Sequence, residues 1–251
     1  MASDFQEDSK VEQRVVDLLV PEEKSDLRNI GRMSEIFDLT VDELDEKRII
    51  HQGMRDKRLL SRFRDIRTKI VEQTAGKAGS IMVTSVGEGG GCSFVSTNLA
   101  ACIALDHGKT SLLVSANIYS PEQTQFEVGE DVPGFTDFLD DPRVSAEDVI
   151  FATGVPRLRY VPVGSIRSGH EYYSSYRLSQ FIEEVCERYE DRYVIVDAPS
   201  IGSTADPRVI ADLCDSVLLV IPYGQVTSDQ IKAAIDSFPK EKVLGAVFNH
   251  T

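Results

Sequence analysis

The residues best suited to chemistry form a glycine-rich loop at residues 87–93 (GEGGGCS), which follows a short apolar run. Glycines let the backbone of such a loop curl until its N–H groups point inward, and a helix that begins at the loop adds positive potential. This layout binds phosphate. A working phosphate-binding loop also needs a lysine directly before its Ser or Thr, to reach the outer phosphates. Cys92 stands in that position, whereas Ser93 keeps a hydroxyl able to coordinate magnesium, and the bulky Phe94 follows.

Three further polar side chains follow apolar runs. Residues 193–196 (YVIV) lead into Asp197, and residues 110–114 (TSLLV) lead into Ser115, with Asn117 two residues further on. Ligands of open α/β sheets bind beyond the carboxyl ends of the strands, so these side chains are expected near the loop. Asp197 either holds a water on magnesium, as at the end of a Walker B strand, or serves as a hydrogen-bonding carboxylate at a strand end.

Two other groups also have two interpretations each. Cys92 is either a reactive thiol whose pKa is lowered by a helix N-terminus or a small side chain that fills the place of the missing lysine. The tyrosine group at residues 170–176 (HEYYSSY) either packs at the start of a helix or is phosphorylated by a protein kinase.

A sheet is needed to bring these residues together, and the pattern of the sequence predicts one. Short apolar runs alternate with helical patterns, which predicts an α/β fold: a doubly wound, mainly parallel sheet with helices on both faces. The predicted strands are residues 80–85, 110–114, 158–163, 193–196, 216–221 and 243–248. The predicted helices are residues 56–73, 93–106, 135–139, 176–189, 207–213 and 228–238.

Composition divides the chain into three parts. Residues 1–40 are predicted to be an acidic arm, partly helical or mobile, followed by a helical lead-in over residues 41–78 and the α/β domain over residues 79–251. The charge changes sign at this lead-in: residues 1–50 hold 14 acidic and 7 basic side chains, whereas residues 51–72 hold 3 acidic and 7 basic ones. Within the lead-in, apolar residues spaced by three and four form one stripe of a basic helix.

Composition also excludes several classes of function. The net charge of −14 disfavours a nucleic-acid partner, whose phosphates would be repelled. No apolar run approaches the roughly 18–20 residues of a membrane helix, and the acidic start differs from a secretory signal. We therefore expect a cytoplasmic protein that reaches the inner membrane only through a partner. The four dispersed cysteines argue against a zinc site or a disulfide framework.

Residues 80–251 resemble the cytoplasmic domain of bacterial tyrosine kinases of the capsule and exopolysaccharide export type, which are relatives of the ParA and MinD P-loop ATPases. The loop is flanked by residues 84–85 (TS) and 96–100 (STNLA), as in the family's TS…ANLA. The other matching segments are residues 134–139 (GFTDFL, family GLTDFL), 161–164 (VPVG, LPAG), 193–200 (YVIVDAPS, YVIIDTPP), 205–206 (AD, TDA) and 245–249 (GAVFN, GVVLN). It implies a P-loop NTPase fold. The remnant of the nucleotide site that it identifies comprises Gly87, Glu88, Gly89, Gly90, Gly91, Ser93 and Asn249.

The same resemblance identifies what has been replaced. The family's loop ends in Gly-Lys-Ser/Thr-Thr and its second strand in Asp-x-Asp, and this lysine and both carboxylates serve catalysis and magnesium. The degenerate positions here are Cys92, Ser115 and Asn117, and Tyr119 stands where an arginine often follows. No catalytic residue is therefore assigned, beyond a residual Asp197. No cofactor is assigned either; the surviving loop amides leave weak binding of ATP or ADP as an alternative, with magnesium then held by Ser93 and Asp197.

The basic helix carries a second signal of the family, E-x-x-R-x-x-R, which joins neighbouring subunits. Arg64 and Arg67 match this motif, but Ser61 replaces its glutamate. The two arginines either contact an acidic partner or another copy of the chain, or lie on a solvated basic face.

Three hypotheses follow. The first is a degenerate kinase that acts as an adaptor or scaffold in polysaccharide polymerisation and export, docking on a membrane co-polymerase through the helix at residues 56–73 and the edge of the sheet. The second is a divergent but active tyrosine kinase or ATPase of the same pathway, with a lysine supplied by Lys109 or by a partner. The third is a ParA-like positioning protein on DNA, which the acidic composition disfavours.

Overall fold

The computed structural model describes residues 39–250 apart from 122–124, 127, 130–131, 167–171, 175 and 203. The predicted acidic arm therefore lies outside the described residues, except for its last two positions.

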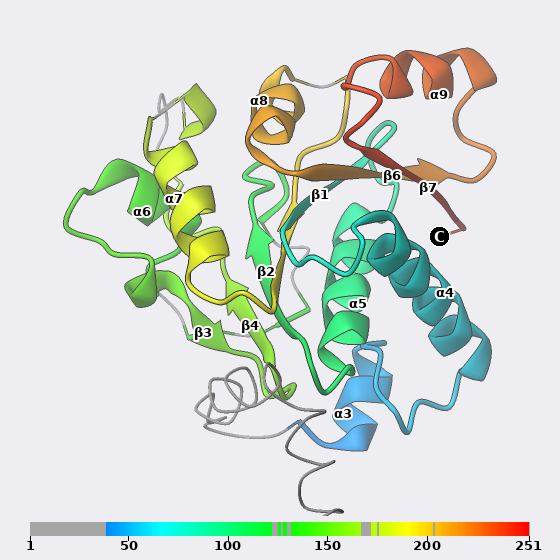
Figure 1. Cartoon of the computed structure of the whole chain (residues 1–251), viewed down its shortest axis with the longest axis horizontal. Helices are drawn as coiled ribbons and strands as arrows, with labels where there is room; N and C mark the ends of the chain where they lie inside the picture. Colours follow the sequence, from blue (N-terminus) through cyan, green and yellow to red (C-terminus); the bar gives the residue numbers. More distant parts are fainter. Residues whose placement is uncertain are drawn as a thin grey trace, which may run out of the picture. The chain divides into compact units, whose positions relative to one another are not determined.

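The described residues form a seven-stranded sheet with the order β3-β4-β2-β5-β1-β6-β7 (Figure 1). Every neighbouring pair is parallel except β3 with β4. The prediction of a mainly parallel, doubly wound sheet is thus confirmed. The strands are β1 (Ser80–Ser85), β2 (Thr110–Ser115), β3 (Phe151–Ala152), β4 (Leu158–Val161), β5 (Arg192–Asp197), β6 (Ser216–Pro222) and β7 (Val243–Asn249).

Burial explains why the sequence predicted most of the strands. β1, β5 and β6 are buried at every residue, because helices cover both faces of the sheet, and such strands are near-continuous apolar runs. The sequence did not predict β3. This antiparallel edge strand has two residues, too few to show any hydrophobic period.

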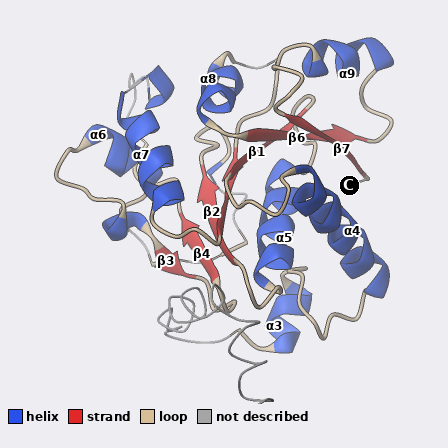
Figure 2. Ribbon diagram, viewed as in Figure 1, coloured by secondary structure: helices blue, strands red, loops and turns tan. Residues whose placement is uncertain are grey.

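The helices are arranged in two layers around the sheet (Figure 2). Helices α4 and α5 pack on one face, and α6, α7 and α8 pack on the other. Within the described residues, no helix combines the length and the apolar character needed to cross a membrane. The helices are α3 (Val41–Glu46), α4 (Lys57–Gln73), α5 (Cys92–Ala104), α6 (Phe135–Asp140), α7 (Tyr176–Glu187), α8 (Asp206–Leu213) and α9 (Ser228–Ile235), with short 3₁₀ turns at Glu147–Val149 and Tyr172–Ser174.

Local sequence signals fix both helices of the lead-in. Thr40 and Glu43 form a reciprocal capping box at the start of α3, and the Asp56 carboxylate accepts hydrogen bonds from the first N–H groups of α4. Leu60, Phe63 and Ile70 form the buried stripe of α4. Their spacing of three and seven residues places them on one face, so α4 is amphipathic.

The lead-in shares its hydrophobic core with α5 and the sheet. The Asn98 side chain of α5 accepts a hydrogen bond of 2.8 Å from the Ile50 N–H. The ring of Phe94 meets Phe63 edge to face at 6.2 Å between ring centroids, and the Arg48 guanidinium lies 5.0 Å from the Phe94 centroid. Helix α5 is therefore held along its side by the segment that precedes the sheet.

Candidate functional site

The glycine-rich loop lies between β1 and the N-terminus of α5, at the carboxyl edge of the sheet. Gly87, Gly89 and Gly91 have φ angles of 90°, 67° and 75°, a region that strongly favours glycine. A side chain at Gly90 would place its Cβ 2.8 Å from the Ser85 Cβ. The loop thus requires its glycines, as expected for a backbone that curls around a ligand.

The end of β7 supports the same loop. The Asn249 side-chain amide donates a hydrogen bond of 3.0 Å to the Gly90 carbonyl, and the Ser85 hydroxyl donates one of 2.7 Å to the Gly87 carbonyl. Asn249 therefore belongs to the site, and its structural part is to hold the loop.

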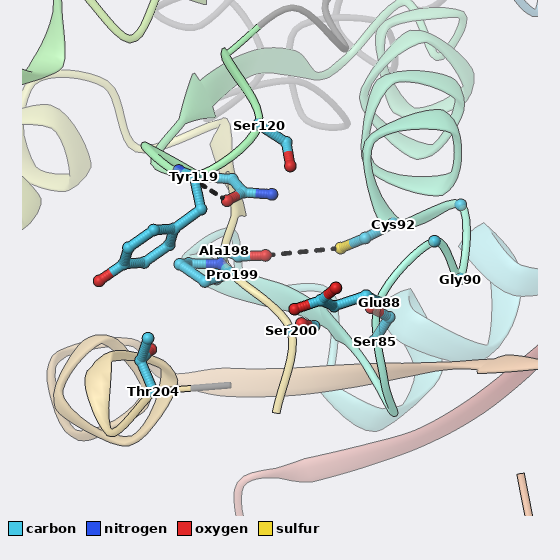
Figure 3. Close-up of a pocket in the computed structure, with 13 residues that line it drawn as sticks. Ser85, Glu88, Gly90, Cys92, Tyr119, Ser120, Ala198, Pro199, Ser200 and Thr204 are labelled. Carbon is cyan, nitrogen blue, oxygen red and sulfur yellow. Dashed lines mark hydrogen bonds between the residues drawn. The ribbon is translucent and has the colours of Figure 1, made fainter. Parts of the chain in front are cut away.

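A cavity of about 450 Å³ opens beside this loop (Figure 3), a size within the range of small-molecule sites. Among the described residues that line it, Glu88 is the only one with a formal charge, and it is negative. A phosphate group entering the cavity would find backbone N–H groups but no cationic side chain among these residues. The lining residues are Ser85, Glu88, Gly89, Gly90, Gly91, Cys92, Asn117, Tyr119, Ser120, Ala198, Pro199, Ser200 and Thr204.

The Cys92 thiol is directed into the protein at the first position of α5. Its Sγ donates a hydrogen bond of 3.2 Å to the Val83 carbonyl and a longer one of 3.8 Å to the Ala198 carbonyl, the latter drawn in Figure 3. Burial, together with the nearby Asp197 carboxylate, raises the pKa of Cys92 well above its usual value. The interpretation as a low-pKa reactive thiol is contradicted, because the side chain is buried and its burial raises the pKa of the thiol.

Asp197, the last residue of β5, is 4% exposed. Its Oδ1 accepts a hydrogen bond of 3.1 Å from the Ser96 hydroxyl, and the side chains of Ser93 and Cys92 also hydrogen-bond to it. Burial still raises the pKa of Asp197, although these hydrogen bonds favour the carboxylate form. Asp197 thus joins β5 to the first turns of α5. The sequence did not identify Ser96 as a hydrogen-bond partner of Asp197. The only signal for this contact was the position of Ser96 one helical turn after Cys92.

The carboxyl end of β2 is neutral. Ser115 is the last residue of the strand, and the Asn117 side chain accepts a hydrogen bond of 3.2 Å from the Tyr119 N–H, which forms a local turn. The Tyr119 hydroxyl donates a hydrogen bond of 2.6 Å to the carboxylate of Asp206, at the start of α8. This link between β2 and α8 was not predicted. Among the described residues, no group of three or more His, Cys, Asp or Glu side chains is placed to hold a metal ion.

Lys109 cannot replace the missing lysine. It precedes β2 and therefore lies at the amino edge of the sheet, about 20 Å from the loop at 3.3 Å per strand residue. Its ammonium lies 5.2 Å from the centroid of the Tyr193 ring. The hypothesis that Lys109 acts within its own chain is wrong, because the strand carries it to the opposite edge.

The predicted tyrosine group divides in the structure. Tyr172 and Tyr173 are buried at 3% and 4% exposure, whereas Tyr176, the first residue of α7, is 76% exposed. Packing at the start of a helix therefore describes the first two, and they are inaccessible to a kinase in the folded protein.

The two arginines of α4 have different surroundings. Arg64 is exposed. Arg67 is half-buried and donates a hydrogen bond of 3.2 Å to the Cys102 carbonyl near the end of α5. Arg67 thus has a contact within the chain, and Arg64 presents its charge outward.

Comparison with known proteins gives the chain its relatives. Tyrosine-protein kinase CpsD of Streptococcus agalactiae is 31% identical over 191 residues, which cover 74% of this chain and 80% of that protein. Succinoglycan biosynthesis transport protein ExoP of Rhizobium meliloti is 25% identical over 201 residues, which cover 75% of this chain but 24% of ExoP. The solved kinase domain of Escherichia coli tyrosine kinase ETK superposes with a TM-score of 0.68 at 23% identity, covering 92% of this chain and 94% of that domain. None of the protein-family models matches the chain.

Proposed function

Because this chain belongs to the bacterial tyrosine-protein kinase family, we propose that it is a catalytically degenerate member that acts as an adaptor or regulator in exopolysaccharide or capsule polymerisation and export. One observation carries the proposal: the cavity at the glycine-rich loop has no cationic side chain among its described lining residues and contains Glu88. An anionic nucleotide is disfavoured in such a cavity.

The magnitude of the loss supports this conclusion. Phosphoryl transfer depends almost entirely on positioning and on stabilising charge, and removing one preorganised group of this kind costs about 10²–10³ in rate. Three such groups are replaced here, at Cys92, Ser115 and Asn117. Even with strong non-additivity, the remaining rate should be negligible. Each lost charged hydrogen bond also weakens nucleotide binding by about 1.5–3 kcal/mol.

The proposed pathway and partner rest on the relatives. ExoP is named as a succinoglycan biosynthesis transport protein, and this chain matches about a quarter of its length. We infer that a membrane co-polymerase provides the membrane-spanning helices that the described residues of this chain lack. This partner would hold the chain at the cytoplasmic face of the inner membrane. The exposed basic face of α4, including Arg64, is the proposed docking surface for an acidic segment of that partner.

A thermal-shift titration with ATP or ADP, each with magnesium at millimolar concentration, tests the proposal. The wild-type chain should give a flat response. Restoring the charges together, with Cys92→Lys, Ser115→Asp and Asn117→Asp, should produce a magnesium-dependent rise, because a ligand at a hundredfold excess over its Kd stabilises the native state by about 2.7 kcal/mol. The matched control replaces the lysine by methionine, Cys92→Met, alongside the same two aspartates. A wild-type chain that is stabilised by Mg-ATP and forms ADP would prove the proposal wrong.

The alternative is a divergent active kinase, and the loop itself favours it. The curled backbone is intact, and Ser93 and Asp197 lie at its base. Such an enzyme needs a cation from a partner, so activity should appear only in the presence of the co-polymerase. It should then disappear in Asp197→Ala and persist in Glu88→Gln.

A further inference from the structure

Strand β7 forms an open edge of the sheet. In the described part of the chain it pairs only with β6, and it is the outermost strand on its side (Figure 1). Edge strands normally carry a charge, a proline or a bulge, because an open row of N–H and C=O groups invites pairing with another strand. Residues 243–249 (VLGAVFN) contain neither charge nor proline. A register shift lies at the beginning of the strand, between Val243 and Gly245, so the following residues form a regular edge.

The regular part of β7 exposes two apolar side chains. Ala246 is exposed, and Phe248 is 65% exposed. The Asn249 carbonyl accepts a hydrogen bond of 2.8 Å from the Tyr223 N–H on the β6 side. Because backbone groups of successive residues point to alternate sides of a strand, those of Phe248 and Ala246 face the open edge.

This edge is complementary to itself about a two-fold axis through Val247. In an antiparallel arrangement, Val247 opposes Val247 of a second copy, and Phe248 opposes Ala246 of that copy on either side of the axis. Opposed residues of this kind exchange both of their backbone hydrogen bonds and point to the same face. The large Phe248 ring therefore covers a small side chain in each pair.

We propose that β7 pairs in antiparallel orientation with β7 of a second copy, which joins two sheets into one. The distribution of charge favours β7 of a second copy as the partner of this edge. The net charge of −14 makes most pairings of two copies repulsive, whereas this strip opposes no like charges. Tyr223, 66% exposed and with its ring 5.7 Å from that of His250, extends the apolar surface at the carboxyl end of the strand. Closed two-fold dimers are also the commonest symmetric assembly.

Sedimentation velocity of the full chain, from low micromolar to submillimolar concentration, tests the proposal. The wild-type chain should form dimers. Phe248→Glu places charge on the edge, and Ala246→Pro removes an N–H that faces outward and makes no bond to β6; each should raise the dimer dissociation constant at least about tenfold. Tyr176→Glu, a charge added to an exposed tyrosine on α7, should leave the dimer intact.

A mixing experiment makes the test specific to this register. Phe248→Glu and Ala246→Lys chains should each be monomeric alone and should associate when mixed, because the glutamate of one opposes the lysine of the other. If Ala246→Pro fails to fold, this pair of variants still tests whether β7 pairs with β7 of a second copy. A melting temperature near that of the wild type verifies that each variant is folded. A wild-type chain that stays monomeric at every concentration overturns the proposal. So does a dimer that survives both Phe248→Glu and Ala246→Pro but dissociates in Arg64→Glu, since it would then form through α4.

Discussion

Helix α5 borders two different regions: the cavity at its N-terminus and the packed contact with the lead-in along its side. At its N-terminus, Cys92 lines a cavity in which the described lining residues include no cationic side chain. Along its side, the ring of Phe94 packs against Phe63 and the Arg48 guanidinium. One region is an open cavity, and the other is closely packed. We therefore expect the stability of the fold to depend more on the contact between α5 and the lead-in than on the residues at the cavity.

The largest expected effect concerns the lead-in contact. Phe63→Ala should lower the free energy of unfolding by about 3–5 kcal/mol, because it removes a fully buried aromatic side chain and leaves a cavity. Urea denaturation measures this change. Arg62→Ala, on the exposed side of the same helix, is the matched control and should stay within about 0.5 kcal/mol of the wild type. If both variants behave alike, the lead-in is not part of the core, and the comparison fails.

A substitution at the cavity should lower the free energy of unfolding less than Phe63→Ala does, and Asp197 provides the test. Asp197→Ala removes the carboxylate to which the side chains of Ser96, Ser93 and Cys92 hydrogen-bond. Ser96 and Cys92 keep backbone carbonyl acceptors, so the loss should be only about 1–3 kcal/mol. Glu88→Gln, at the exposed carboxylate of the same cavity, should change stability by no more than about 0.5 kcal/mol. A loss at Asp197 as large as that of Phe63→Ala would show that the pocket is as important to the fold as the lead-in.

The pH dependence of stability provides a second test at Asp197. Burial raises the pKa of Asp197 above its usual 3.8, so over the interval above that value the native state binds more protons than the unfolded state. The free energy of unfolding therefore falls as the pH rises through this interval. Asp197→Asn removes this titration, so its stability relative to the wild type should increase as the pH rises above about 4. A constant difference over that range would contradict the raised pKa.

The sequence predicted the sheet well because each central strand is a short apolar run, with its polar residues mostly at the two ends. It placed Asp197, Asn117 and the loop at one edge for the same reason, since parallel strands end together. It could not predict that the Cys92 thiol turns inward to Val83, because side-chain direction depends on tertiary packing. The place of Lys109 at the amino edge, by contrast, already follows from its position directly before the predicted strand at residues 110–114.

Long-range contacts were equally invisible to local patterns. In the sequence, Phe94 is only a bulky residue that follows the loop, whereas in the structure its ring packs on a helix some thirty residues earlier in the chain. The bond from Arg67 to Cys102 spans a similar separation. A matching motif identified both arginines of α4 equally, and only the packing of α4 on α5 distinguishes them.

That distinction gives the smallest expected effect. Arg67→Ala should lower the free energy of unfolding by about 1 kcal/mol, because it removes a half-buried hydrogen bond to the Cys102 carbonyl. Arg64→Ala should change stability by no more than about 0.5 kcal/mol. Urea denaturation of both variants side by side makes the measurement, with Arg62→Ala again as the reference. Equal losses at Arg64 and Arg67 would mean that α4 uses both arginines to hold α5, and the proposed outward docking face would then lose its central residue.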